Sequence, residues 1–159
     1  MSTAYHAMYL ANKLTLRNPG SDAKRFGNTL FNASINLNPH QIEAAMFAFK
    51  SPVSKGVILA DEVGLGKTIE AGLIISQYWS EMKRKILVTA PASLIKQWQG
   101  ELIDKFNIPS EVMDSKAFKK YQKENYYNPF IQENKVIIAS HHFVSNMKDK
   151  VKLANFDLL

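Results

Sequence analysis

A glycine-bearing loop between an apolar run and a helical pattern constrains this chain more than any other feature. Gly56 to Ala60 is a short apolar run typical of a buried strand, and Thr68 to Trp79 follows a helical pattern. Between them, residues 60–68 read Ala-Asp-Glu-Val-Gly-Leu-Gly-Lys-Thr. Strand, glycine loop, lysine, hydroxyl and helix, in that order, are the layout of a phosphate-binding loop. The sequence therefore predicts an α/β fold of the P-loop type.

The residue types in this loop suit a nucleotide triphosphate. Glycines let the backbone turn so that several N–H groups point into one concavity, and the helix N-terminus adds partial positive charge. Lys67 is the candidate catalytic residue, because its charge would reach the β- and γ-phosphates, and Thr68 would offer its hydroxyl to Mg²⁺. The predicted cofactors are ATP and Mg²⁺. The candidate nucleotide-binding residues in the loop are Asp61, Glu62, Val63, Gly64, Leu65, Gly66, Lys67 and Thr68.

One position departs from the general pattern G-x-x-x-x-G-K-[ST], because Asp61 occupies the place of the first glycine. The alternative interpretation is a lysine that merely opens a surface helix after a glycine-rich turn. The flanking strand and helix patterns favour the phosphate loop. Kinases and many GTPases keep that glycine, whereas one branch of the helicase-like ATPases does not.

Four segments, in order along the chain, resemble the Swi/Snf-type ATPases of helicase superfamily 2, and within them the bacterial RapA-like group. Residues 61–71 resemble motif I of that family. Leu37-Asn38-Pro39-His40-Gln41 is similar to its adenine-reading segment, residues 88–98 resemble motif Ia, and residues 136–143 resemble its next strand-to-loop element. The resemblance covers about residues 37–159. Residues 1–36 match nothing in the family.

The resemblance implies a RecA-like parallel sheet flanked by helices, and ATP hydrolysis coupled to movement along double-stranded DNA. It implies that Gln41 contacts adenine, and that a second RecA-like lobe supplies arginines to the γ-phosphate. It also implies contacts with a nucleic-acid backbone at the candidate residues Pro91, Ala92, Ser93 and Ser140. RNA polymerase and a restriction or defence complex both remain open as further partners.

Three of these residues have an alternative role at a helix start. Gln41 falls three residues after Asn38, where a glutamine completes a capping box. Ser93 and Ser140 each follow a predicted strand, where a serine equally well caps the next helix.

A P-loop ATPase also needs acidic groups at a second strand end, one for Mg²⁺ and one for the attacking water. The only Asp-Glu pair here is Asp61-Glu62, within the loop, and Asp157 lies at the start of an apolar pattern. We therefore expect an N-terminal piece of a longer lobe, inactive by itself. Two other classes remain: a self-contained P-loop kinase or nucleotide transferase, and a non-catalytic ATP-binding module.

Amino-acid composition restricts the possible functions less than the motifs do. The 20 Lys and Arg against 14 Asp and Glu give a net charge of +6, which suits a phosphate backbone but does not require one. Absence of cysteine excludes disulfides and thiolate metal sites. No apolar run approaches the roughly 20 residues that span a bilayer, so we expect no membrane partner and a cytoplasmic location.

Periodicity predicts a helical N-terminal extension at 1–36, and the resemblance implies a second domain, a partial RecA-like ATP-binding lobe at 37–159. A helix should begin at Pro39, capped by Asn38, and bury Ile42, Ala45, Met46 and Phe49. A later helix should bury one stripe of Leu94, Trp98, Leu102 and Phe106. The remaining predicted elements are strands at 86–90, 111–113 and 135–139, and helices at 93–106, 116–123 and 141–152.

Overall fold

The computed structural model describes residues 37–50, 56–62, 64–124 and 127–159. The predicted helical extension and Val63 lie outside the described residues. The helices are α3 (Pro39–Lys50), α4 (Lys67–Ser80), α5 (Ile95–Phe106), α6 (Ser115–Lys123), α7 (His141–Asn146) and α8 (Lys148–Ala154). The strands are β1 (Leu87–Ala90), β2 (Ser110–Val112) and β3 (Val136–Ser140). Each of these strands lies within one residue of its predicted position.

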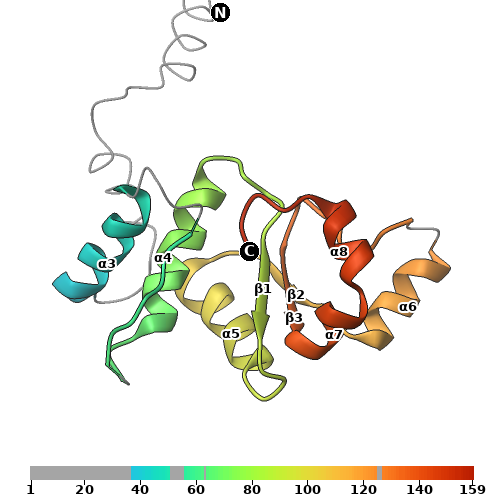
Figure 1. Ribbon diagram of the computed structural model, residues 1–159, viewed down its shortest axis with the longest axis horizontal. Helices are drawn as coiled ribbons and strands as arrows, with labels where there is room; N and C mark the ends of the chain where they lie inside the picture. The colour runs from blue at the N-terminus through green and yellow to red at the C-terminus, as the bar shows by residue number, and fades with distance from the viewer. Residues whose placement is uncertain (1–36, 51–55, 63, 125–126) are drawn as a thin grey trace, which may run out of the picture.

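The three strands form one parallel sheet in the order β1-β3-β2 (Figure 1). β3 runs parallel to both neighbours, with Ala90 beside Ser140 and Val112 beside Ile138. Parallel neighbours need crossover connections, and helices α5, α6 and the segment before β3 supply them. The predicted α/β class with a parallel sheet flanked by helices is confirmed.

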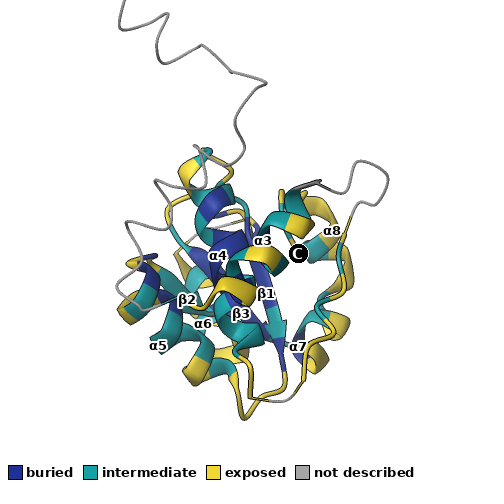
Figure 2. Ribbon diagram, turned by 90° about the vertical axis from the view of Figure 1, so that its left-hand side faces the viewer, coloured by how far each residue is buried: buried dark blue, intermediate teal, exposed yellow. Residues whose placement is uncertain are grey.

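Helices cover both faces of the sheet (Figures 1 and 2). Side chains alternate along the strands, so each face of the sheet has its own core. Ile86, Val88, Val136 and Ile138 pack with α3, α4 and α5. Leu87, Ile137 and Ala139 pack on the opposite face with aromatic residues near α6 and α7, among them Phe118, Phe130 and Phe143.

The predicted face of α3 is confirmed, since Ala45 is fully buried and Ile42, Met46 and Phe49 pack against the first core. The stripe on α5 is only partly buried. Leu102 and Phe106 lie in the core, but Leu94 precedes the helix, in a turn, and is 42% exposed. The prediction for Leu94 was wrong because the helix begins two residues later than its pattern indicates.

The strand predicted at 56–60 is absent. A parallel strand needs a hydrogen-bonded neighbour, and the place beside β1 is taken by Leu158, which bridges to Ile86. Val57 and Leu59 still pack against the core, whereas Ile58 is 89% exposed. The segment alternates between packed and exposed side chains as a strand does, but it lacks the hydrogen bonds to a neighbouring strand.

The helix predicted at 141–152 is two helices, divided at Met147. Ser145 and Asn146 come directly before the division, and both have side chains that compete with backbone hydrogen bonding in a helix. Among the helices that the structure describes, none is long and apolar enough to cross a membrane.

Candidate nucleotide-binding site

The candidate site is the loop that enters α4. α4 begins at the same end of the sheet at which β1 and β3 finish, so the loop shares this end with the residues that follow both strands (Figure 1). In parallel α/β sheets, ligands bind outside the carboxyl ends of the strands. The fold therefore puts the predicted loop where a ligand site is expected.

Two glycines shape the loop. Gly64 has φ of 95° and Gly66 has φ of 94°, both in the left-handed region that side chains with a Cβ avoid. Gly66 is also the N-cap of α4, and its carbonyl accepts from the N–H groups of Ile69 and Glu70. A Cβ at Gly66 would lie 2.5 Å from Nε2 of Gln41. Glycine is required here by backbone conformation and by a close neighbour.

Lys67 folds back onto the first half of the loop. Its Nζ donates to the carbonyl oxygen of Asp61 at 2.7 Å and to that of Glu62 at 2.8 Å. An ammonium has three donors and its stem is flexible. These contacts hold a cation at the mouth of the loop without engaging it in an ion pair that a phosphate would have to break.

Gln41 and His40 connect α3 to the second half of the loop. Nε2 of Gln41 donates to the Leu65 carbonyl at 3.0 Å, and Nε2 of His40 lies 3.1 Å from the same oxygen. Oε1 of Gln41 accepts from the N–H of Asn38 at 3.1 Å, which is the capping contact that the sequence indicates. Contact between Gln41 and adenine stays a prediction.

Glu70 is a buried carboxyl behind the loop. Its side chain is fully buried, and neither oxygen has a hydrogen-bond partner in the described structure. Burial raises the pKa of Glu70 above its ordinary value, and the nearby Asp61 carboxylate raises this pKa further, while His40 and Lys67 oppose the shift. A carboxyl in this setting favours its neutral form.

The candidate nucleic-acid residues lie together. Ala90 and Ser140 are partners in the ladder between β1 and β3, so Pro91, Ala92 and Ser93 follow one strand where Ser140 ends the next. The turn at 91–94 is exposed and is closed by the N–H of Leu94 donating to the Pro91 carbonyl. Oγ of Ser140 accepts from the N–H of Phe143 at 3.1 Å, so Ser140 does cap α7. Its hydroxyl can still donate to another group.

Asp157 lies at the other end of the sheet. Its Oδ2 accepts from the N–H of Lys85, just before β1, at 3.0 Å. Arg84 stacks over the ring of Trp79, and Lys83 over that of Tyr78, at this same end. None of these three charged residues approaches the phosphate loop, which agrees with the sequence-based placement of Asp157 away from a strand end.

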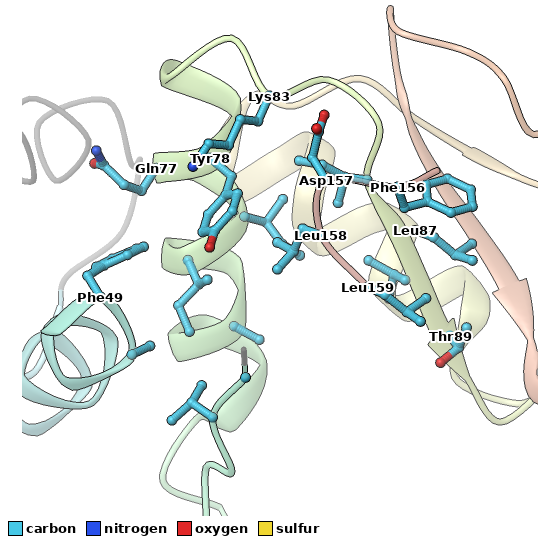
Figure 3. Close-up of a pocket in the computed structure, with 18 of the residues that line it drawn as sticks. Phe49, Gln77, Tyr78, Lys83, Leu87, Thr89, Phe156, Asp157, Leu158 and Leu159 are labelled. Carbon is cyan, nitrogen blue, oxygen red and sulfur yellow. The ribbon is translucent and has the colours of Figure 1, made fainter. Parts of the chain in front are cut away.

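A groove of about 990 Å³ is separate from the loop. It runs between α4 and β1, and Leu158 and Leu159 extend into it (Figure 3). Its lining is apolar along Ile74, Tyr78 and Val88. Among the described residues of the motif from Asp61 to Thr68, none lines this groove, so its size says nothing about nucleotide binding.

Two residues of the site escaped sequence reasoning. The sequence places His40 only at the start of a helix, yet its imidazole reaches a loop carbonyl 25 positions away. Glu70 lies three and four positions before Leu73 and Ile74, on the buried side of α4, and that spacing was the available signal. An acid on the apolar face of a helix indicates a group held for a specific purpose or at a cost.

A parallel sheet covered by helices, with a glycine loop and Lys67 at the N-terminus of α4, is the layout of P-loop domains. The model of the SNF2-related domain matches residues 40–158. The chain belongs to this family, and it is a Swi/Snf-type ATPase domain of the RapA-like kind.

Its relatives are much longer proteins. The RNA polymerase-associated protein RapA of Cronobacter sakazakii is 38% identical over 78% of this chain and 13% of its own length. The ATP-dependent helicase YqhH of Bacillus subtilis is 49% identical over 51% of this chain and 14% of its own length. The SWI2/SNF2 ATPase core of Sulfolobus solfataricus, solved in complex with dsDNA, matches 70% of this chain and 22% of that one with a TM-score of 0.57 and 26% identity. The chain thus spans about an eighth of the curated relatives it matches.

Proposed function

We propose that this chain binds ATP with Mg²⁺ at the loop of residues 61–68, as part of a protein that couples ATP hydrolysis to movement along double-stranded DNA. The observation that carries the proposal is the ammonium of Lys67 held on two backbone carbonyls at the mouth of a glycine-shaped loop. Family membership supports ATP use, and the dsDNA complex of the related ATPase core supports the choice of nucleic acid.

The loop residues fit a triphosphate. Lys67 would exchange two neutral carbonyl acceptors for phosphate oxygens, which form stronger charge-assisted hydrogen bonds. The hydroxyl of Thr68, in the first turn of α4, would face the metal ion. Bound Mg²⁺ would supply neutralisation of the phosphate charge. Gln41, at the start of α3, would carry the adenine contact.

The nucleic-acid contact would come from the strand ends. Pro91, Ala92 and Ser93 lie exposed beside Ser140, and hydroxyls and backbone N–H groups bind phosphate oxygens without reading bases. The basic balance of the chain favours this contact over a long range. We propose that DNA lies across the carboxyl ends of β1 and β3.

Hydrolysis would need groups from the rest of the protein. The described residues hold no acidic pair at a second strand end near the loop, so this chain alone should bind nucleotide without turnover. We propose that a second RecA-like lobe supplies arginines, and that the whole protein acts in the cytoplasm. RNA polymerase is a candidate partner, since RapA is by name an RNA polymerase-associated protein.

The test has two parts. Titration of this chain with a fluorescent ATP analogue and Mg²⁺ should show binding that Lys67→Ala weakens at least about tenfold, because a charge-assisted contact to phosphate is lost. Lys96→Ala, an exposed lysine on α5, is the matched control and should bind as the wild type does. In the longer protein, duplex DNA should stimulate ATP hydrolysis, and Lys67→Ala should abolish it.

Each part can fail separately. Equal affinity of the wild type and Lys67→Ala would remove Lys67 from the nucleotide site. Hydrolysis indifferent to DNA in the longer protein would oppose translocation. Transfer of phosphate to a small acceptor by this chain would favour a kinase.

A further inference from the structure

The contact between α3 and the phosphate loop converges on a single atom. The carbonyl oxygen of Leu65 lies 3.0 Å from Nε2 of Gln41 and 3.1 Å from Nε2 of His40. A carbonyl oxygen only accepts hydrogen bonds, so the His40 imidazole must carry its proton on Nε2. Two donors on successive residues of one helix therefore hold the two lone pairs of one loop carbonyl.

That carbonyl belongs to the peptide group that joins Leu65 to Gly66. Leu65 lies between Gly64 and Gly66, both with positive φ. Glycine crosses between conformations at little steric cost, so the peptide group joining Leu65 to Gly66 could rotate readily if nothing held it. The contacts from His40 and Gln41 oppose that rotation.

Orientation of the carbonyl fixes the orientation of the next N–H. In a trans peptide the C=O and N–H bonds point in opposite directions. Holding the Leu65 oxygen toward α3 therefore directs the Gly66 N–H away from α3. Phosphate loops bind their ligand through such N–H groups, arranged before the ligand arrives.

We propose that His40 is a positioning residue for the phosphate loop: with Gln41 it holds the Leu65 carbonyl so that the Gly66 N–H is directed at the nucleotide phosphates. The inference rests on the proposed function for what the N–H binds, but not for the hold on Leu65 itself. His40 acts through Leu65 and has no contact with the nucleotide.

Substitution of His40 separates this role from a general structural one. His40 is exposed at the start of α3, so His40→Ala should fold, whereas Gln41 is buried and its replacement also removes the cap on Asn38. Glu43, exposed on the same helix, provides the matched control Glu43→Ala.

The first measurement needs no ligand. In amide ¹H–¹⁵N spectra of the 159-residue chain, His40→Ala should shift or broaden the signals of Leu65, Gly66 and Lys67, and leave those of β3 in place. Glu43→Ala should leave the loop signals unchanged. If the two variants give the same loop spectra, His40 does not hold Leu65, and the inference is overturned whether or not the chain binds ATP.

The second measurement tests whether the contact between His40 and the Leu65 carbonyl contributes to nucleotide binding. His40→Ala should weaken ATP and ADP about three- to tenfold, the effect of one hydrogen bond, while AMP binding stays unchanged. An equal loss for AMP would place His40 at the base or sugar and contradict the inference. Absence of ATP binding by the wild type, with Lys67→Ala no different, would refute the proposed function, and the spectra would still decide the hold on Leu65.

Discussion

At the scale of single residues, the loop depends on which atoms surround a backbone position. Gly66 and Gly64 have nearly the same φ, but among the described residues only Gly66 has a neighbour within contact distance of an added Cβ. Substitution at Gly64 would therefore cause backbone strain alone, whereas substitution at Gly66 would cause both strain and a steric clash. The sequence shows both as glycine and cannot distinguish them.

Gly66→Ala should therefore damage the site in two ways. The left-handed conformation costs an L-residue roughly 1–2 kcal/mol, and the new Cβ would displace the Gln41 amide from the Leu65 carbonyl. We expect lower stability in urea unfolding and weaker ATP binding. Gly56→Ala is the control, because no atom of the described residues lies within 4 Å of its added Cβ. If Gly66→Ala behaves as Gly56→Ala does, the contact with Gln41 does not restrict the loop.

Glu70 should make stability depend on pH. Because its pKa is raised in the folded state, folding binds a proton above the ordinary value of 4.5, and stability falls as pH rises from there through the raised pKa. Glu70→Gln removes this dependence. It should match the wild type near pH 4 and be more stable at pH 7, because the amide cannot take on the negative charge that burial disfavours.

Urea unfolding at the two pH values measures this difference, with Glu43→Gln on the exposed face of α3 as control. A stability change of the same size at both pH values would mean that Glu70 acts through packing and not through its charge.

At the scale of elements, a second pair of glycines reports on helix packing. Gly72 on α4 faces α5, and a Cβ there would clash with the ring of Phe106. Gly100 on α5 has only a carboxylate oxygen of Asp104 at 3.8 Å. Gly72 lets the two helices approach closely, whereas Gly100 has no such role.

Opposite outcomes are expected from the same substitution. Gly72→Ala should destabilise the chain by about 1–3 kcal/mol through overpacking. Gly100→Ala should stabilise it by up to about 1 kcal/mol, because alanine favours the helix. Thermal unfolding of both variants is the measurement. Stabilisation by Gly72→Ala would show that α4 and α5 do not pack as closely as described.

At the scale of the whole molecule, charge and sheet topology act together. Parallel pairing of β1 with β3 brings Pro91, Ala92, Ser93 and Ser140 to one edge, although nearly 50 positions separate them in sequence. The net charge of +6 adds a favourable potential for a polyanion.

DNA binding should weaken steeply with salt, because each phosphate that a lysine or arginine of this basic chain neutralises releases counterions. Anisotropy of labelled duplex DNA, measured between about 50 and 200 mM salt, should give a straight line of log affinity against log salt. Affinity unchanged by salt would contradict contact with the phosphate backbone.

Local pattern was enough for much of this protein. Helices and the three strands follow from the spacing of apolar residues, and the glycine turn that enters α4 follows from the types and order of residues 61–68, because both depend on near neighbours in sequence. The prediction of a strand at 56–60 was wrong, because a strand needs a hydrogen-bonded neighbouring strand and the spacing of apolar residues does not show whether one is present.

Contacts between distant segments needed the tertiary structure. The burial of Glu70, the meeting of Ser140 with the segment after β1, and the two donors on the Leu65 carbonyl are such contacts. His40 lies 25 positions before Leu65, and only the packing of α3 against α4 brings its imidazole to that oxygen. The sequence by itself determined which groups could bind a phosphate, whereas long-range packing decided which of them are held in place to do so.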